Sequence, residues 1–526
     1  MKGFNLSQWA LDHKSFVVYL MLAIAIAGFL DYRKLGREED PPFTIKTMVV
    51  KTVWPGATTL EMLQQVTDRI EKKLEELPRL DYLRSYTKPG ESVVMVNLKD
   101  TTPASEVPDL WYQVRKKVGD IRQTLPSGVQ GPFYNDEFGD TYSVIYALTA
   151  DGFSQRELRD WAEHVREHLL GVPDVAKIDL VGTQDEKIYL EFSTQQMAAM
   201  GLDTAQIVAT LQAQNAVLPS GTVDAGPEKI AIRVSGQFTS EASIEAVNFR
   251  ANGRFVRLSD IARVRRTYVD PPQPMFRYNG QPAIGVAVSM TKNGDALALG
   301  ENVKRQLETV RADLPVGIEP HLVADQPHVV EEAVGEFTKT LMEAIAIVLA
   351  VSFLSLGWRP GIVVAIAIPL VLAITFVCMN LFNISLQRIS LGALIIGLGL
   401  LVDDAMIAVE MMIKKLEEGA DKISAATFAY TSTAFPMLTG TLVTIAGFVP
   451  VGFAQSSAGE YCFTLFAVVG IALTASWFVA VLFTPLTGVF ILPDKFKSHA
   501  HEPSRWARAF RSLLERALHL KWMVIG

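Results

Sequence analysis

Cysteine is almost absent from this chain, and so is any strong excess of one charge. Only Cys378 and Cys462 occur in 526 residues, and both lie in apolar stretches. Two cysteines cannot supply a disulfide framework, so we expect buried free thiols. The formal net charge is −7, from 49 basic and 56 acidic residues, so the charge balance gives no indication of nucleic-acid binding.

Basic residues are also missing from the centres of the apolar runs. Apolar residues make up 49% of the chain and charged residues still supply 20%, which predicts a membrane protein with a large soluble part. A membrane-spanning helix takes about 20 residues. Six runs approach this length, and none has a Lys or Arg near its centre: residues 15–30, 338–356, 361–380, 389–412, 436–455 and 462–484.

The fourth run carries two adjacent carboxylates, Asp403 and Asp404. An ionisable group at this depth costs roughly 2.5–3.5 kcal/mol even on a lenient scale, so both must face protein or water. Acids this close do not ionise independently, which favours a bound proton and suits a proton relay. A buried acid that only cross-links helices is the alternative. Since the runs hold no central cation, we expect the partner of the pair to lie outside these 526 residues.

The distribution of basic residues predicts the orientation. Arg359 and Lys414-Lys415 mark cytoplasmic ends, whereas the loops 381–388 and 456–461 offer only Arg388. The positive-inside rule then places both chain ends in the cytoplasm and the block of residues 40–335 outside it. Ala25-Ile26-Ala27 fits a signal-peptidase site, so a cleaved signal peptide is an alternative for the first run. The later runs favour an uncleaved helix.

The carboxy-terminal stretch is basic and amphipathic. Residues 505–518 are expected to lie along the inner membrane surface, with a soluble linker helix as the alternative. A new apolar run begins at residue 519 and stops after one or two turns. We therefore expect the chain to be cut at the start of a seventh span.

The soluble block contains an internal repeat of about 95 residues. Its first copy has a strand, a helix and two strands that should pair, and a helix follows: 43–54, 58–77, 81–86, 92–98 and 108–125. Its second copy has the same order, again with its last two strands paired: 142–149, 155–170, 175–181 and 187–192. A further strand, helix and strand are expected at 282–290, 296–312 and 317–323. This order indicates split βαβ sandwiches.

Residues 194–265 break the rhythm and indicate an inserted, partner-facing module, with a helix at 204–214 and a hairpin at 219–227. His164 and His168 have the i, i+4 spacing of metal ligands, although a solvated helix face is the simpler interpretation. Met197 and Met200 are interpreted as packing residues rather than a soft-metal site.

Several motifs in this order identify a family resemblance. The most specific is Gly-Leu-Gly-Leu-Leu-Val-Asp-Asp-Ala-Met-Ile-Ala-Val-Glu at 397–410, and others are Trp54-Pro55-Gly56-Ala57, Val181-Gly182, Ala213-Gln214-Asn215 and 279–283. Over its whole length the chain resembles the inner-membrane pumps of the resistance-nodulation-division (RND) superfamily, in particular the hydrophobe and amphiphile efflux branch. The resemblance implies two homologous halves of six spans each, of which this chain looks like the amino-terminal half.

The fold implied is an α-helical polytopic membrane domain, with six spans and the start of a seventh, and a large α+β periplasmic domain of split βαβ (ferredoxin-like) subdomains. The expected segments are as follows: 1–36, amino terminus and first span; 37–135, first porter subdomain; 136–181 and 270–335, the two parts of the second porter subdomain; 182–269, docking subdomain; 336–492, spans two to six; 493–526, amphipathic helix and start of a seventh span.

The resemblance also implies a function. Family pumps are homotrimers of the bacterial inner membrane that join a periplasmic adaptor and an outer-membrane channel and exchange protons for drugs, with no cofactor. Asp403 and Asp404 match the proton-carrying pair, whose lysine partner lies in the second half. The metal-exporting branch usually has one aspartate there, so the pair favours amphiphilic organic substrates. Phe138 and Tyr142 are the candidate pocket residues, although residues 136–142 depart from the family pattern.

The sequence leaves three other functions to compare with this one. An intramembrane aspartyl protease needs aspartates on two facing spans, whereas Asp403 and Asp404 lie on one helix, about 100° apart. A receptor or secretion accessory of the same fold, and an exporter of lipid or metal, stay open alternatives.

Overall fold

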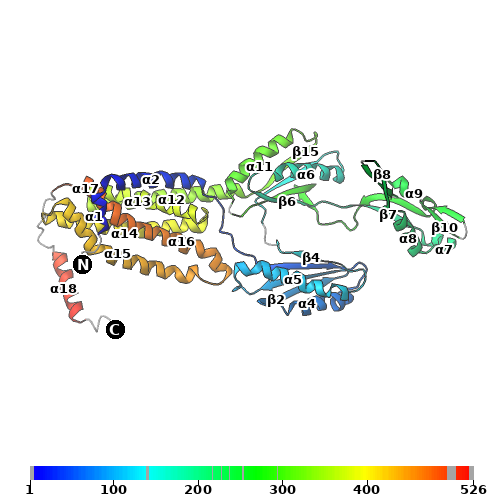
Figure 1. The fold of residues 1–526 in the computed structure, drawn as a ribbon, viewed down its shortest axis with the longest axis horizontal. Coiled ribbons are helices and arrows are strands. Elements are labelled where there is room, and N and C mark those ends of the chain that lie inside the picture. Colours follow the sequence, from blue (N-terminus) through cyan, green and yellow to red (C-terminus); the bar gives the residue numbers. More distant parts are fainter. Residues whose placement is uncertain are drawn as a thin grey trace. The chain divides into compact units, whose positions relative to one another are not determined.

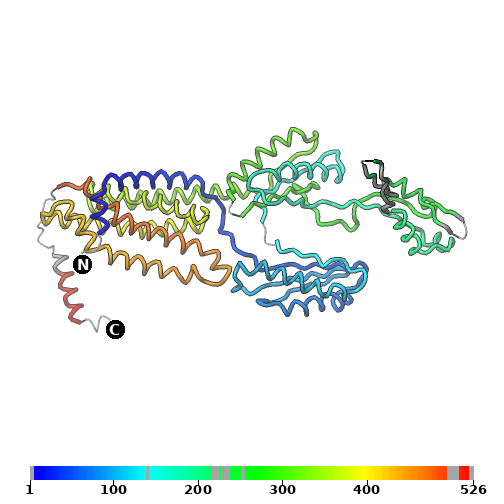
Figure 2. The backbone as a smooth tube through the Cα atoms, viewed as in Figure 1, coloured from blue at the N-terminus to red at the C-terminus, as the bar shows by residue number. Residues whose placement is uncertain are grey.

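The computed structural model describes residues 5–137, 141–215, 217–226, 228–235, 237–251, 254–292, 294–494 and 505–520. The chain divides into two compact units (Figures 1 and 2). Unit 1 comprises residues 1–141, 291–299 and 326–526, and unit 2 comprises residues 142–290 and 300–325. Phe138 lies outside the described residues.

Long apolar helices make up most of unit 1. Within the described residues, six helices are long and apolar enough to cross a membrane. They are α2 (Lys14–Lys34), α12 (Gln326–Leu356), α13 (Trp358–Leu381), α14 (Arg388–Glu417), α15 (Lys422–Gly452) and the continuous α16 (Ser457–Phe478), η4 (Val479–Phe483) and α17 (Thr484–Ile491). Short helices α1 (Leu6–Asp12) and α18 (Arg505–His519) lie near the ends of the chain.

The centre of this bundle is α14, which contacts α12, α13, α15, α16 and α17. Over half of the apolar windows of α13 and α14 is buried, against 11% for α2, so α2 lies on the outside of the bundle. Where α2 touches α13 the backbones are very close, because a Cβ on Gly28 would lie 2.5 Å from the Ala373 Cα.

Unit 1 also contains a four-stranded antiparallel sheet. Its strands are β1 (Thr47–Val53), β2 (Leu80–Lys88), β3 (Glu91–Leu98) and β4 (Gln130–Asn135), in the order β2-β3-β1-β4. One face is covered by α3 (Thr59–Met62), η1 (Leu63–Thr67), α4 (Asp68–Leu74) and α5 (Val107–Ile121). Met48 and Val50 of β1 and Val94 and Val96 of β3 alternate into this core. The alternation of buried and less buried residues along these strands is therefore that of a sheet with one buried face.

Unit 2 has a five-stranded sheet, in which four strands lie in the same relative order as the four strands of the unit 1 sheet. Its strands are β5 (Val144–Ala150), β6 (Val175–Val181), β13 (Phe276–Tyr278), β14 (Gln281–Met290) and β15 (Ile318–Asp325). β14 lies between β6 and β5, and β15 pairs with the other edge of β5. Helix α6 (Gln155–Leu170) packs on β5, β6 and β14, and α11 (Ala296–Arg311) connects β14 to β15.

The predicted pairing of residues 175–181 with 187–192 is wrong. β6 pairs with β14, while β7 (Glu186–Phe192) pairs with β12 (Ala262–Tyr268) in a separate ribbon. The chain leaves the sheet at Gly182, where φ is +85° and a Cβ would lie 2.4 Å from the Phe276 Cβ. Only glycine tolerates this conformation and this contact. The chain therefore leaves the second repeat after β6, and β14 supplies the strand that pairs with β6.

The inserted module between β6 and β13 has its own small core. It contains α7 (Thr194–Met200), α8 (Thr204–Gln214), the hairpin β8 (Val217–Ala225) and β9 (Glu228–Ser235), α9 (Glu241–Glu245), β10 (Asn248–Ala251), β11 (Arg254–Arg257) and α10 (Leu258–Ile261). Met197 and Met200 pack against this core, so their interpretation as packing residues is confirmed. No group of three or more metal-binding side chains occurs among the described residues, and the His164 and His168 rings lie 4.6 Å apart.

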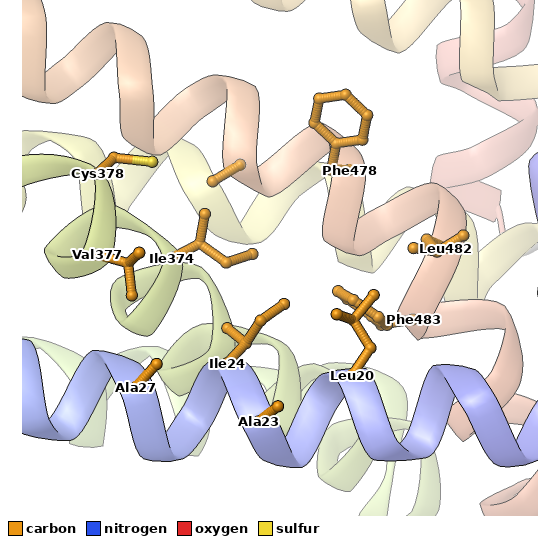
Figure 3. A pocket seen from close by; sticks show the side chains of 11 residues that line it. Leu20, Ala23, Ile24, Ala27, Ile374, Val377, Cys378, Phe478, Leu482 and Phe483 are labelled. Atoms are coloured by element: carbon orange, nitrogen blue, oxygen red, sulfur yellow. The ribbon is translucent and has the colours of Figure 1, made fainter. Parts of the chain in front are cut away.

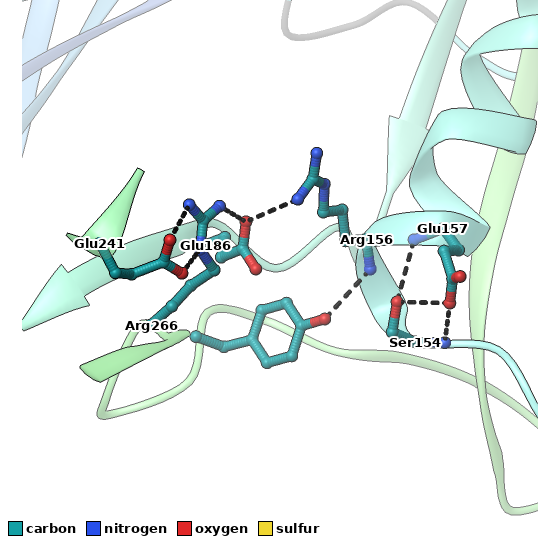
Figure 4. A network of polar contacts seen from close by, with 7 residues as sticks. Ser154, Arg156, Glu157, Glu186, Glu241 and Arg266 are labelled. Carbon is teal, nitrogen blue, oxygen red and sulfur yellow. Dashed lines mark hydrogen bonds and ion pairs between the residues drawn. The ribbon is translucent and has the colours of Figure 1, made fainter. Parts of the chain in front are cut away.

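Ion pairs fasten the module to the second sheet (Figure 4). Arg266 of β12 binds Glu241 of α9 and Glu186 of β7, with 3.1 Å between Arg266 Nη1 and Glu186 Oε2. Arg156 of α6 approaches the same Glu186 carboxylate at 3.9 Å. The backbone N–H of Arg156 also donates to the Tyr268 hydroxyl at 3.1 Å. The base of the module is thus held to α6 by charged and polar groups at the protein surface.

Candidate functional site

Helix α14 carries the candidate site, and its ends are well defined by the sequence. The Gln387 side chain caps the amino terminus, with Oε1 accepting from the backbone N–H of Ile389 and Ser390 at 2.6 and 3.1 Å. Lys414 and Lys415 lie in the last turn, where positive charge complements the helix dipole. Asp403 and Asp404 occupy the middle of this 30-residue helix.

The two aspartates have different surroundings. Asp404 is 9% exposed and lies close to Ser476 of α16. The Ser476 hydroxyl donates to the Leu401 carbonyl at 2.7 Å. Asp403 is exposed on the surface of α14.

Both aspartates line a cavity of about 380 Å³ between α14 and α15. Four hydroxyl groups of α15 also line it, and each donates to a carbonyl of its own helix at 2.7–3.0 Å: Ser432, Thr433, Thr441 and Thr444. Their lone pairs are left to accept hydrogen bonds from water or from a protonated carboxyl group. Pro436 adds a further acceptor, because it has no N–H for the Ser432 carbonyl.

The two aspartates were predicted from the sequence, but the row of hydroxyl residues on α15 was not. The signal was present as Thr431-Ser432-Thr433, Pro436, Thr441 and Thr444 within an apolar run. The described residues that line the cavity include no Lys or Arg. The site thus consists of two acids and a set of neutral acceptors, which can hold and pass a proton.

A second cavity differs from the first in having an apolar lining (Figure 3). It has a volume of about 440 Å³ and lies between α2, α13 and the α16–η4 segment. Its lining is apolar, including Leu20, Ile24, Ile374 and Phe483, and the Cys378 thiol borders it. Cys378 and Cys462 are both free and partly buried, as the sequence predicted. The described residues that line this cavity include no carboxyl group.

The candidate pocket residue Tyr142 lies just before β5 in unit 2. Its hydroxyl donates to Asp179 Oδ2 of β6 at 3.1 Å, and the residue is 36% exposed. The other candidate, Phe138, is among the residues that the structure does not describe. The pocket assignment stays a prediction.

Residues 6–525 match the model of the AcrB/AcrD/AcrF family. The match covers nearly the whole chain, and this chain therefore belongs to that family of RND permeases, which are multi-pass membrane transporters. The assignment agrees with the resemblance found in the sequence motifs.

Curated relatives include proteins of differing cargo. The chain is 26% identical to the cation efflux system protein CzcA of Alcaligenes sp. (strain CT14), over 97% of this chain and 50% of that protein. It is also 26% identical to the multidrug resistance protein MdtC of Pantoea ananatis (strain AJ13355), over 94% and 48%. An uncharacterized transporter of Haemophilus influenzae is 25% identical, over 91% and 46%. The chain spans about half the length of the curated relatives it matches.

Proposed function

We propose that this chain is part of a proton-driven efflux pump of the bacterial inner membrane, in which Asp403 and Asp404 carry the protons. The observation that supports this most is the pairing of two mid-helix acids with a hydroxyl-lined cavity in an otherwise apolar bundle. The gradient is a sufficient source of energy, since one charge crossing 100 mV is worth about 2.3 kcal/mol. The pump is a secondary active antiporter and uses no cofactor.

The proposed architecture follows the basic-residue distribution and the strand order. The six long helices span the membrane, and residues 40–335 lie in the periplasm as two split βαβ porter subdomains and an inserted docking subdomain. The pump works as a homotrimer with a periplasmic adaptor and an outer-membrane channel. Its cargo is amphiphilic or hydrophobic and is taken from the inner membrane or the periplasm, with Tyr142 and Phe138 as pocket residues.

Metal export is the second candidate, because identity to a cation-efflux relative equals identity to a multidrug relative. Accumulation of a fluorescent amphiphile and of Zn²⁺ in the same cells separates the two. Export of the amphiphile alone supports the first proposal, and export of Zn²⁺ alone replaces it.

The role of the aspartates is tested by Asp403→Asn and Asp404→Asn in the gene product that contains this chain. Each change keeps the shape of the side chain but removes its ability to bind and release a proton. We expect both variants to be expressed and assembled normally and to lose export, measured as intracellular accumulation of the cargo. Glu417→Gln at the exposed end of α14 is the matched control and should export normally. Normal export by both asparagine variants contradicts the proposal.

A further inference from the structure

We propose that Lys46 and Glu460 form a mechanical joint, which fixes the first turn of α16 to the β1–β3 sheet so that α16 transmits changes at Asp404 to that sheet. The two residues are positioning residues for the transport cycle. The inference rests on the proposed function, and both ends of α16 lie within unit 1.

Lys46 is the unusual residue at this joint. Its side chain is 6% exposed, although lysine is rarely buried unless it is paired. The ammonium group lies 3.0 Å from Glu460 Oε1, donates to the Asp100 carbonyl oxygen at 2.7 Å and lies 3.8 Å from Asp100 Oδ1. The ion pair to Glu460 and the hydrogen bond to Asp100 hold the charge of the ammonium in one place.

The start of α16 is bound through Ser457, Glu460 and Tyr461. Glu460 Oε2 accepts from the backbone N–H of Thr44 at 2.9 Å, beside the ion pair to Lys46. The backbone N–H and the hydroxyl of Ser457 both donate to Asp100 Oδ1, at 2.9 and 2.6 Å.

Tyr461 completes the attachment. Its hydroxyl donates to Asp40 Oδ1 at 2.7 Å, and its ring meets the Phe43 ring edge-on at a centroid distance of 6.2 Å. The start of α16 is thus attached both to the segment that leads into β1 and to the turn that follows β3.

The joint is continuous with the sheet. Directly after Lys46, β1 begins at Thr47, and the backbone N–H of Leu98 at the end of β3 donates to the Lys46 carbonyl at 2.9 Å. A displacement of the Lys46 ammonium therefore acts on the two central strands rather than on a free loop.

The other end of α16 reaches the aspartate site. The helix runs without proline over 22 residues from Ser457 to Phe478. At 1.5 Å per residue, Glu460 and Ser476 are roughly 24 Å apart along the axis. Ser476 bonds to the Leu401 carbonyl and neighbours Asp404, and α16 packs along both α14 and α15. An unkinked helix fixed at both ends moves as one body, so a rearrangement at Ser476 is delivered to Lys46.

A purely structural role predicts something different. A buried ion pair is often replaced by apolar groups with little loss of stability. If the joint only stabilised the fold, an apolar replacement that keeps stability would also keep transport. If the joint transmits movement, transport is lost although the aspartates still respond to pH.

The test uses Lys46→Met in the gene product that contains this chain, purified and reconstituted in proteoliposomes. Substrate export is measured under a pH gradient, and protonation of the aspartates is measured separately by the pH dependence of labelling with dicyclohexylcarbodiimide. We expect export to fall at least tenfold while the labelling profile keeps its midpoint. Lys51→Met on the same strand is the control, because Lys51 is 49% exposed and pairs only with Glu91 among the described residues. It should leave both readouts unchanged.

Two further variants decide the remaining outcomes. Where Lys46→Met does not assemble, Glu460→Gln is measured by the same criteria, since the amide keeps the acceptor for Thr44 and removes the ion pair. In a background without Cys378 and Cys462, a short bis-thiol reagent joining Phe43→Cys to Tyr461→Cys should restore export to the Lys46→Met variant several-fold.

Normal export by Lys46→Met or by Glu460→Gln overturns the joint, and so does a cross-link that restores nothing. Loss of the labelling profile together with export also overturns it, because the lysine would then act on the aspartates themselves. The proposed function fails independently, if Asp403→Asn and Asp404→Asn export normally.

Discussion

Asp403 and Asp404 are neighbours in sequence but differ in their environment. Asp404 is buried and Asp403 is exposed on the surface of α14, and both line the cavity shared with α15. A buried acid and an exposed acid that share one polar cavity suit two steps of one proton transfer. The sequence could identify the pair because two acids in an apolar run are a local signal. It could not identify their acceptors, since Ser432 and Thr441 come from another helix.

Asp100 should make the attachment of α16 sensitive to acid. The Ser457 hydroxyl and N–H donate to its carboxylate and hold the pKa of Asp100 below its ordinary value of 3.8. A lowered native pKa gives stability that is present above the ordinary value and is lost as the pH falls through the native one. We expect Asp100→Asn to melt at a lower temperature than the parent protein at neutral pH, and the difference to vanish in acid.

The Asp100 side chain is 60% exposed, so solvent screens the effect and the shift should be small. Glu106→Gln, at another exposed ion pair of the same sheet domain, is the control for general loss of charge. If the difference in melting temperature between Asp100→Asn and the parent protein is the same at neutral pH and in acid, Asp100 does not act through its charge.

At the scale of elements, the sequence predicts helix boundaries that depend on local residues but does not predict which distant strands pair. Helix α6 spans Gln155–Leu170 as predicted, because Ser154 and Glu157 form a capping box that fixes its start. The helix at 204–214 was also placed correctly. The strand at β7 was recognised, but its partner β12 lies about 80 residues away and no period in the sequence encodes that choice.

The contact between α2 and α13 gives a test at this scale. Gly28→Leu should destabilise the protein, because its Cβ would meet the backbone of Ala373 at 2.5 Å and the helices would have to separate. Overpacking of this kind costs about 1–3 kcal/mol, which exceeds the roughly 1 kcal/mol that helix propensity returns when a glycine is replaced. The thermal melting midpoint of the purified protein measures the balance.

Gly119→Ala in α5 is the matched control, since nothing lies within 4 Å of its added Cβ. It reports the gain in propensity alone and should leave the melting midpoint unchanged or raise it. Equal midpoints for Gly28→Leu and the parent protein would mean that α2 is not packed on α13 in the membrane.

At the scale of the whole molecule, orientation rests on the basic residues at one set of helix ends. Single cysteines at Asp151, in unit 2, and at Glu417, at the end of α14, report the two sides. In intact cells an impermeant maleimide should label the cysteine at 151 and leave the cysteine at 417 unlabelled until the cells are broken. Labelling of both, or of the second alone, contradicts the proposed topology.

The central claim is that proton entry at Asp403 and Asp404 is coupled to export. The most direct measurement follows substrate and proton together in proteoliposomes that hold the purified gene product under an imposed pH gradient. We expect the parent protein to move substrate and protons in opposite directions. In Asp404→Asn, neither movement should exceed the background of protein-free liposomes. Substrate export at the parent rate by Asp404→Asn, with the gradient still required, would contradict it.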